Sequence, residues 1–291
     1  MAERFQHLEK LGEGTYGKVY KCLDVTNQKT VALKVINLTN DDEGIPSSAI
    51  REISLLKDIR HPNIVRLEDV LHCDRKLLLV FEYADTDLRK FLDQHDGVLH
   101  IDTIKLLMKQ LLQGIETVHL NKILHRDLKT QNLLICHTND QLCLKIADFG
   151  LARSYGIPVK SYSHEVVTLW YRSPELLCGA LRYGPSIDMF SIGCIFAELV
   201  NGNALFPGKS VDSQLNLIFE TLGTPTPDLW PGVTNLPKYS NEWPVRVGRP
   251  FHEICPRLDD KGLDLLKSML HYDPSQRITA TEALSHDFFK N

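Results

Sequence analysis

The sequence lacks any long uninterrupted run of apolar residues. No stretch approaches the ~18 residues that suggest a membrane-spanning helix, and the N-terminal segment MAERFQHLEK has no apolar core like that of a secretory signal. Internal repeats and low-complexity tracts are also missing. These absences predict a soluble intracellular protein and give no support to a membrane partner or a repetitive structural role.

An excess of positive charge and paired cysteines are lacking too. Lys and Arg total 33 against 37 Asp and Glu, a formal net charge of −4, which argues against nucleic-acid binding. The seven cysteines form no CxxC pair and fit neither a disulfide set nor a zinc site. We expect reduced, mostly buried thiols and a location in the cytoplasm, the nucleus or both.

What the chain does contain is an ordinary globular composition with strand signals in its first eighty or so residues. The 291 residues, 43% hydrophobic, suit one large domain or two modest ones. VALKVI (31–36) and KLLLVFEY (76–83) are predicted strands. Alternation in the first places its side chains on two faces: Val31, Leu33 and Val35 on one, Ala32, Lys34 and Ile36 on the other.

Helical spacing dominates from residue 85 onward. IDTIKLLMKQLLQGIETVHL (101–120) has long helical periodicity, and SIDMFSIGCIFAELV (186–200) is apolar nearly all round, as a core helix would be. We therefore expect an α+β protein in which a small β-rich lobe precedes a larger helical lobe, with a hinge near 82–87.

The stretch EGIPSSAIRE (43–52) begins a helix expected over 46–59. Its apolar stripe is centred on Glu52, while Ile50 falls on the opposite, polar side. A buried carboxylate is costly without a partner. A Lys34–Glu52 ion pair would resolve this and aim the ammonium at phosphate oxygens. The plainer alternative is a partly exposed lysine and an acid at a lobe edge.

LGEGTYGKVY (11–20) contains G-x-G-x-x-G with Gly12, Gly14 and Gly17. A dinucleotide-binding loop would open a helix, but the following KVYKCLDV is typical of a strand. This context favours a hairpin whose backbone N–H groups lie over a polyphosphate. Taken alone, the motif fits a plain glycine-rich turn equally well.

Two further motifs favour a phosphoryl-transfer site. HRDLKTQN (125–132) fits H-R-D-L-x-x-x-N, and DFG (148–150) follows the predicted strand LCLKIA. Asp127 is suited to orient a substrate hydroxyl, and Asn132 and Asp148 supply oxygen ligands suited to Mg²⁺. Each acid alone is more often a turn or cap residue, but four motifs in this order argue strongly against coincidence.

With these motifs the chain resembles the eukaryotic protein kinases over essentially its whole length, and most closely the cyclin-dependent kinases. EGIPSSAIRE is similar to that family's cyclin-contacting helix signature, with Ser48 where Thr is more common. The resemblance implies a two-lobed kinase domain over 1–291, with an N-lobe of about 1–83, a C-lobe of about 84–291, and ATP and Mg²⁺ between them. Lys129 resembles the lysine that Ser/Thr kinases carry in their catalytic loop, which is HRDLKTQN (125–132) in this chain. Thr168 resembles the residue that hydrogen-bonds to this lysine and to Asp127.

The resemblance also implies the nucleotide-binding residues. The glycine loop and Lys34 would hold the phosphates, the hinge backbone would bond the adenine edge, and apolar side chains would sandwich the ring. The residues implied around the base are Leu11, Val19, Ala32 and Leu134, with Glu82 and Ala84 at the hinge, Phe81 behind the base and Asp87 at the mouth.

The resemblance also implies regulation of activity by phosphorylation of the activation segment, residues 148–175. Arg51, Arg126 and Arg153 each suit an ordinary surface or ion-pair role, but together they resemble the cluster that binds a phosphate on this segment. Ser163 matches the phosphorylated position, and a phosphate there adds roughly −1.5 to −2 charge. An activating kinase is thus an expected partner.

Inhibition and substrate choice are implied by two further short segments. Thr15 and Tyr16 resemble sites whose phosphorylation by inhibitory kinases repels the nucleotide, although as bare sequence they suit ordinary turn residues. Val166 and Val167 resemble the pocket for proline after the target residue, with Arg172 supporting the backbone. Because proline has no N–H, a site without a free acceptor can prefer it. Protein substrates with Ser/Thr-Pro sites are expected.

The implied partner at the 46–59 helix is a cyclin, with Ile50 as a contact, in cell-cycle or transcription control. A solvent-tolerated Ile50 is the alternative. A pseudokinase scaffold should lack one of Lys34, Asp127, Asn132 or Asp148, and all are present. Mitogen-activated kinases usually carry a T-x-Y site and glycogen-synthase-type kinases another helix signature, and neither is found here.

Three positions depart from the usual pattern of these kinases. Thr130 stands where Pro is common, Ser173 where Ala is common, and Phe190 where Trp is common. None is a catalytic group, so we expect changes in local packing. Glu175 and Arg277 resemble the buried ion pair that anchors the larger lobe.

Overall fold

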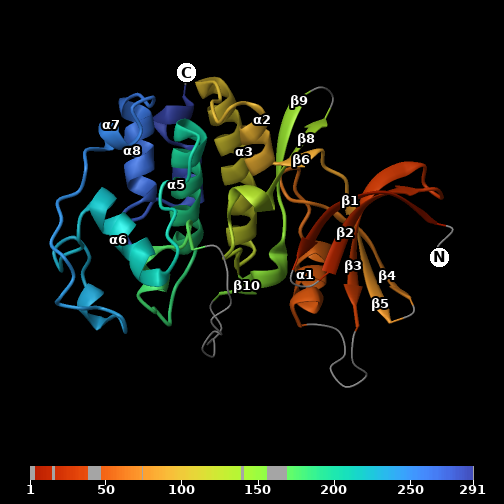
Figure 1. Ribbon diagram of the computed structural model, residues 1–291, viewed down its shortest axis with the longest axis horizontal. Helices are drawn as coiled ribbons and strands as arrows, with labels where there is room; N and C mark the ends of the chain where they lie inside the picture. Colours follow the sequence, from red (N-terminus) through yellow and green to blue (C-terminus); the bar gives the residue numbers. More distant parts are fainter. Residues whose placement is uncertain are drawn as a thin grey trace.

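The computed structural model has a small β-rich lobe beside a larger helical lobe, in the order along the chain that the sequence predicts (Figure 1). The sheet lies at the N-terminal end of the long axis, and the helices fill the rest. The structure describes residues 4–14, 17–38, 47–73, 75–138, 141–155 and 169–290.

The N-lobe is an antiparallel five-stranded sheet in the order β1-β2-β3-β5-β4. Its strands are β1 (Phe5–Gly14), β2 (Gly17–Asp24), β3 (Lys29–Asn37), β4 (Leu67–Cys73) and β5 (Lys76–Glu82). Both strands predicted in this region are present as β3 and β5, each with a boundary shifted by one or two residues.

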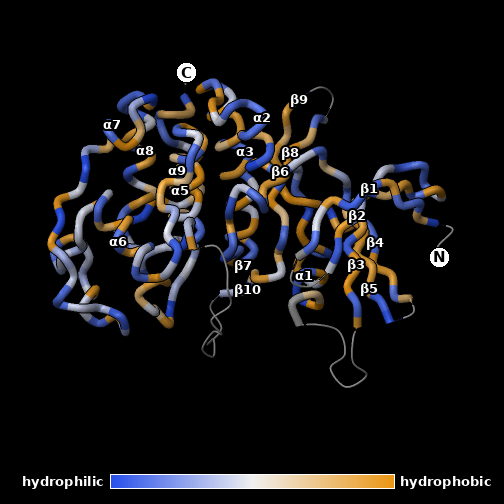
Figure 2. Tube along the Cα trace, viewed as in Figure 1, coloured by the Kyte–Doolittle hydropathy of each residue, from blue (hydrophilic) through white to orange (hydrophobic). Residues whose placement is uncertain are grey.

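The alternation predicted in β3 separates two hydrophobic cores. Val31 and Leu33 pack into a small cluster with Phe5, Cys22 and Val80. On the opposite face, Ile36 joins the large core that continues into the helical lobe. Hydrophobic segments along β3 and β5 are visible in Figure 2. Lys34, on the face of Ile36, is therefore directed toward the space between the lobes.

Helix α1 (Ser47–Asp58) lies against this sheet and confirms the unusual pattern of its sequence. Glu52 is only 3% exposed and Ala49 is 2% exposed, whereas Ile50 is 53% exposed. The helix thus buries an acid and exposes an isoleucine. The expected helix start at Pro46 and the preceding Gly44 lie outside the described residues.

The connection to the C-lobe differs slightly from expectation. Helical spacing from Asp85 predicts a helix, but the chain first forms β6 (Thr86–Asp87) and only then α2 (Leu88–Gln94). The reason is local, because the Asp87 side chain accepts a hydrogen bond from the Lys90 backbone N–H and caps the helix start. Asp85 and Thr86 are left in the extended connection.

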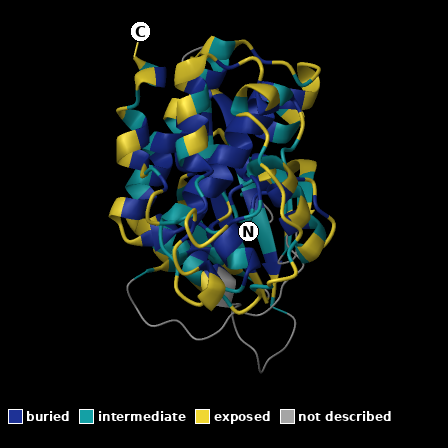
Figure 3. Ribbon diagram, turned by 90° about the vertical axis from the view of Figure 1, so that its left-hand side faces the viewer, coloured by how far each residue is buried: buried dark blue, intermediate teal, exposed yellow. Residues whose placement is uncertain are grey.

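The C-lobe is mainly helical, and its centre is α5 (Ser186–Asn201). Every α5 residue from Ile187 to Val200 is buried, as predicted for a helix that is apolar nearly all round. Figure 3 shows buried ribbon through the middle of the molecule and exposed turns outside. The other helices are α3 (Ile101–Leu120), α4 (Pro174–Leu177), α6 (Val211–Leu222), α7 (Phe251–Ile254), α8 (Asp260–Met269) and α9 (Ala280–Leu284).

Short strands and single turns place the motif residues at the edge of this lobe. Two small sheets have the orders β6-β8-β9 and β10-β7. Their strands are β7 (Ile123–Leu124), β8 (Leu133–Thr138), β9 (Gln141–Ile146) and β10 (Arg153–Ser154). The 3-10 turns are η1 (Thr130–Asn132), η2 (Phe149–Leu151), η3 (Val233–Asn235) and η4 (Asp287–Phe289).

The expected Glu175–Arg277 ion pair is present in the C-lobe. Arg277 Nη1 lies 2.7 Å from Glu175 Oε1, and both side chains are almost fully buried. Phe190 lies under the same guanidinium, 5.2 Å from the ring centroid. The phenylalanine therefore takes part in the packing around the ion pair, which is a local consequence of this departure from the common tryptophan.

Five of the seven cysteines are buried. The expectation of mostly buried thiols is thus confirmed in the structure. Among the described helices, none combines the length and apolarity needed to cross a bilayer.

Candidate active site

A cleft of about 1060 Å³ lies between the two lobes and brings the sequence motifs together. The implied nucleotide-binding residues that line it are Leu11, Gly12, Gly17, Val19, Ala32, Lys34, Phe81, Glu82, Ala84, Asp87 and Leu134. The implied catalytic and metal residues that line it are Glu52, Asp127, Lys129, Asn132 and Asp148. These residues come from both lobes, so only the folded chain assembles them.

The glycine motif forms the end of the β1–β2 hairpin, as its strand context predicts. Gly14 pairs in register with Gly17. A side chain at Gly17 would place its Cβ 2.1 Å from the Val35 carbonyl oxygen, so the close approach of β3 requires glycine there. Thr15 and Tyr16, the implied inhibitory sites, lie outside the described residues.

The predicted ion pair between β3 and α1 is formed. Lys34 Nζ lies 2.7 Å from Glu52 Oε2 and 4.0 Å from Asp148 Oδ1. Burial raises the pKa of the Glu52 carboxyl above its ordinary value, and the Lys34 charge opposes this effect. The ionised state of Glu52 consequently depends on Lys34, which is aimed at the cleft from the N-lobe side.

The catalytic loop orients Asp127 through two neighbours. Lys129 Nζ donates to Asp127 Oδ2 over 2.8 Å, and Asn132 Nδ2 donates to the same oxygen over 2.9 Å. Asn132 Nδ2 also donates to the Asp127 backbone carbonyl over 2.8 Å. Because its amide nitrogen is used in this way, the amide oxygen of Asn132 is left as a ligand for a cation.

Asp188, buried at the start of α5, forms hydrogen bonds with the first residues of this loop. It accepts hydrogen bonds from the backbone N–H groups of His125 and Arg126 over 2.9 and 2.8 Å, and from His119 Nε2 over 2.9 Å. Burial by itself would raise the pKa of Asp188, but these hydrogen bonds outweigh it and lower the pKa below its ordinary value. The bonds hold Arg126 at φ 72°, a backbone conformation that L residues rarely adopt.

The DFG segment turns sharply at Asp148, whose φ is 62°. Phe149 is fully buried edge-on against His125, with ring centroids 4.9 Å apart, while the Asp148 side chain is 50% exposed and faces the cleft. Arg51 and Arg126 donate to the carbonyls of Gly150 and Leu151, so two members of the implied arginine cluster meet here. Arg153, the third, lies just beyond in β10.

Asn132 and Asp148 are suited to hold a divalent cation only together with a substrate. Among the residues that the structure describes, no three His, Cys, Asp or Glu side chains gather closely enough to bind a metal. One amide oxygen and one carboxylate are hard ligands of the kind that Mg²⁺ shares with nucleotide phosphates. The donor set therefore fits a metal that arrives with a polyphosphate.

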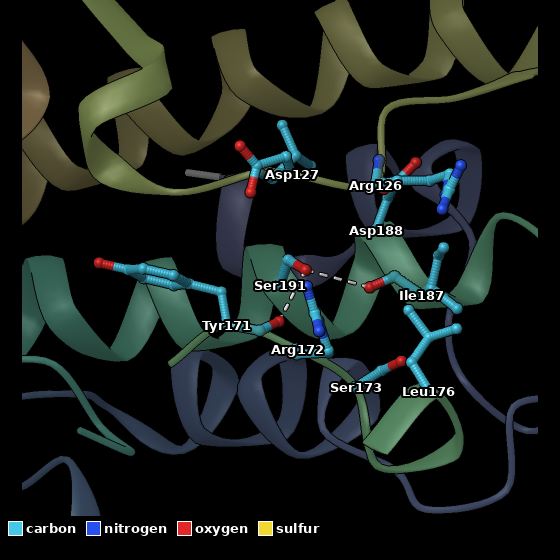
Figure 4. A pocket seen from close by; sticks show the side chains of 10 residues that line it. Arg126, Asp127, Tyr171, Arg172, Ser173, Leu176, Ile187, Asp188 and Ser191 are labelled. Atoms are coloured by element: carbon cyan, nitrogen blue, oxygen red, sulfur yellow. Dashed lines mark hydrogen bonds between the residues drawn. The ribbon is translucent and has the colours of Figure 1, made fainter. Parts of the chain in front are cut away.

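A small pocket of about 10 Å³ lies below Asp127, between the catalytic loop and α5 (Figure 4). Arg172 reaches into it, and burial lowers the pKa of its guanidinium below the ordinary value, opposed by the Asp127 charge. The Ser173 hydroxyl is buried there without a hydrogen-bond partner among the described residues. The other activation-segment residues singled out by sequence, Ser163, Val166, Val167 and Thr168, lie outside the described part of the chain.

Several residues at the site were missed by sequence reasoning. Val65, Tyr83, Lys90, Gln94, Gln131 and Ala147 also line the cleft. Gln131 and Ala147 adjoin the motifs and were within reach of a motif-based search, whereas Val65, Lys90 and Gln94 are distant in sequence and are placed by the fold. Asp188 is signalled only as one of two acids, with Glu198, in an otherwise apolar helix.

The comparison with known families agrees with this geometry over nearly the whole molecule. Residues 5–289 match the model of the family described as the protein kinase domain. The match covers both lobes and every motif of the cleft. The chain belongs to the protein kinase domain family.

Proposed function

We propose that this chain is a Ser/Thr protein kinase of the cyclin-dependent type, which transfers the γ-phosphoryl group of ATP to Ser/Thr-Pro sites on proteins. Membership of the protein kinase domain family implies ATP and typically a divalent metal. The observation that carries the finer proposal is the 2.8 Å contact between Lys129 and Asp127, because a lysine at this place resembles the Ser/Thr form of the loop. The cation of choice is Mg²⁺, given the oxygen ligands at the site.

In the proposed reaction, Asp127 accepts the hydrogen bond of the substrate hydroxyl and orients it in line with the phosphoryl group. Lys34, held by Glu52, and Lys129, held by Asp127, stabilise phosphate charge on the two sides of the cleft. Asn132 and Asp148 would hold the Mg²⁺ together with the nucleotide phosphates. When bound, Mg²⁺ neutralises charge on the phosphates. Thr168 is proposed to bond with Lys129 and Asp127.

Control by a cyclin is proposed at α1. The helix presents Ile50 to solvent on the side opposite Glu52, which is the arrangement expected if a partner holds the helix inward from outside. The Lys34–Glu52 contact crosses from β3 to α1, so moving α1 outward would break it. A regulator that covers Ile50 would thereby act on the catalytic lysine.

Phosphorylation is proposed as a second level of control. A phosphate on Ser163 would bind Arg51, Arg126 and Arg153, two of which already donate to backbone carbonyls of the turn Phe149–Leu151. Phosphates on Thr15 and Tyr16 in the glycine hairpin would repel the nucleotide. Val166 and Val167, backed by Arg172, are proposed to accept the substrate proline.

The test is a kinase assay of the full chain with and without candidate cyclins from its own organism. Matched peptides carrying Ser-Pro, Ser-Ala and Tyr-Pro would serve as substrates, and Asp127→Asn would serve as the inactive control. We expect Ser-Pro phosphorylation that rises strongly with a cyclin. Equal use of the Ser-Ala peptide would refute the proline preference, and full activity of the isolated chain would refute cyclin dependence. A role in cell-cycle or transcription control would follow from the cyclin found.

A further inference from the structure

Two buried acids of α5 form hydrogen bonds with the catalytic loop. Asp188, at the start of α5, accepts the backbone N–H groups of His125 and Arg126 at the beginning of the loop. Glu198, near the other end of α5, is also fully buried and lies beneath Thr130 at the end of the loop. The catalytic Asp127 lies between these two attachments.

The second attachment is a network of side chains around Glu198. Tyr171 Oη donates to Glu198 Oε2 over 2.7 Å, and Arg89 Nη1 donates to Oε1 over 3.0 Å. Thr130 Oγ1 lies 3.1 Å from Tyr171 Oη and 3.5 Å from Glu198 Oε1. All of these side chains except Arg89 are buried. The network therefore joins α2, the catalytic loop, α5 and the segment before α4.

The proton positions in the network follow from its chemistry. A carboxylate only accepts hydrogen bonds, so the Tyr171 proton lies toward Glu198 and the Thr130 hydroxyl donates to the tyrosine oxygen or to the carboxylate. Burial and then the Glu198 charge raise the pKa of Tyr171 above its ordinary value, so the phenol keeps its proton. The Thr130 hydroxyl thus has its hydrogen-bond partners within the network.

Tyr171 is itself fixed to α5 at two points. Ser191 Oγ donates to the Tyr171 backbone carbonyl over 2.8 Å, and the phenol points away from the small pocket (Figure 4). The phenol hydroxyl donates to Glu198. Tyr171 is thus a rigid anchor for Thr130. A hydrogen bond to a rigid buried partner restricts a loop more than one to a mobile surface group.

We propose that the hydroxyl of Thr130 is a positioning group for phosphoryl transfer, acting through the 3-10 turn Thr130–Asn132 on Asn132 and Asp127. Thr130 opens this turn and Asn132 closes it, and the Asn132 amide donates to the Asp127 carboxylate. Proline, common here in the kinases that the chain resembles, would fit the first position of such a turn but has no hydroxyl. In this chain a side-chain attachment to α5 replaces the rigidity of proline.

The activity test compares Thr130→Val with Thr130→Ser in the full chain, and rests on the proposed phosphoryl transfer. Valine keeps the shape and loses the hydroxyl. We expect kcat to fall about five- to tenfold with the KM for ATP unchanged, because misplaced catalytic groups affect the reacting state. Serine should restore most of kcat. Thr281→Val is the matched control, since Thr281 makes an exposed hydrogen bond to Glu116 far from the cleft.

A second measurement does not depend on activity. Amide hydrogen exchange of residues 125–133 should be about fivefold faster in Thr130→Val than in wild type or Thr130→Ser, with no change in Thr281→Val. Tyr171→Phe should make the same change, and adding Thr130→Val to it should add little, because both remove one network.

These two measurements separate the inference from the proposed function. If Thr130→Val exchanges its amide hydrogens at the wild-type rate, the positioning role is overturned whatever the activity. It is also overturned if exchange is faster but the kcat of an active enzyme is unchanged. If the wild-type chain phosphorylates no peptide while exchange responds as expected, the proposed function fails and the attachment of the loop through Thr130 stands.

Discussion

Helices α1 and α5 both bury acidic side chains, but they satisfy them in different ways. Glu52 of α1 has one hydrogen-bond partner among the described residues, Lys34, which belongs to the sheet. Asp188 of α5 accepts three hydrogen bonds, and Glu198 lies in a network of three side chains. A carboxylate with several hydrogen-bond donors keeps most of them when one donor moves. A carboxylate whose single donor belongs to another element loses that hydrogen bond when either element moves.

The surfaces of the two helices differ in the same sense. Each α5 residue from Ile187 to Val200 is buried, so the helix has no face left for a partner. On α1, Ile50 is more than half exposed. The two acids of α5 contact the catalytic loop, whereas Glu52 of α1 contacts the lysine of β3, and we propose that this second contact couples the position of α1 to the active site.

The largest effect is expected from Asp188→Asn. The amide presents N–H groups to backbone donors and loses charge, so we expect a loss of about 3 kcal/mol in the free energy of unfolding together with loss of activity. Urea unfolding and a kinase assay would measure both. Asp264→Asn, which alters an exposed pair with His286, is the control and should change neither. A stable but inactive Asp188→Asn would show that this acid serves chemistry alone.

Glu52→Gln should separate activity from stability. Without the carboxylate, Lys34 loses its support, and we expect kcat/KM to fall about 100-fold. Because burial raises the pKa of Glu52, its ionised form adds little to folding at neutral pH, and the free energy of unfolding should change by less than about 1 kcal/mol. Asp58→Asn, at the exposed end of the same helix, is the control. A large loss of stability in Glu52→Gln would make α1 a fixed element like α5.

Lowering the pH should protonate Glu52 and Asp188 at different points, so a single acid titration should distinguish their roles. A raised pKa means that Glu52 takes up its proton at a higher pH than an exposed glutamate, so the Lys34 pair weakens early. A lowered pKa means that the stability contributed by Asp188 is complete above the ordinary aspartate pKa of about 3.9 and is lost as pH falls through its lower folded value.

We therefore expect activity to decline at a pH where circular dichroism still reports the folded state, with unfolding only at lower pH. The activity measurement would use a substrate peptide without titratable groups in this range. Coincident loss of activity and fold would contradict the assignment of the two acids to separate tasks.

The smallest effect on the isolated chain is expected from Ile50→Asp. Since the side chain is exposed, the free energy of unfolding should stay within about 0.5 kcal/mol of wild type. If the proposed cyclin contact at α1 is correct, binding of a cyclin that activates the chain, measured by titration calorimetry, should weaken at least tenfold. Leu120→Asp, at a still more exposed position on α3, is the control. Unchanged cyclin affinity in Ile50→Asp would leave this isoleucine as a solvent-tolerated residue.

Sequence patterns predicted most of this architecture because its longest elements have strong periodicity. The 101–120 helix begins and ends where expected, and α5 differs by one residue at its end. Mostly helical spacing was expected from residue 85 and a hinge near 82–87, and α2 itself begins at Leu88 because the Asp87 side chain caps its start. The Lys34–Glu52 pair was predicted because a buried charge demands a partner, whereas the Glu175–Arg277 pair was predicted only from the resemblance to known kinases.

The sequence by itself determined the local chemistry: Asp127, Lys129 and Asn132 lie within one loop, and their contacts follow from short-range geometry. Only the tertiary structure decided what holds that loop. Asp188, Glu198 and Thr130 carry no recognisable motif for their contacts, because a hydrogen bond between residues some sixty positions apart exists only once packing of α5 brings them together. Burial inside that packing strengthens such hydrogen bonds, and the residues around each of these groups do not specify which distant partner it meets.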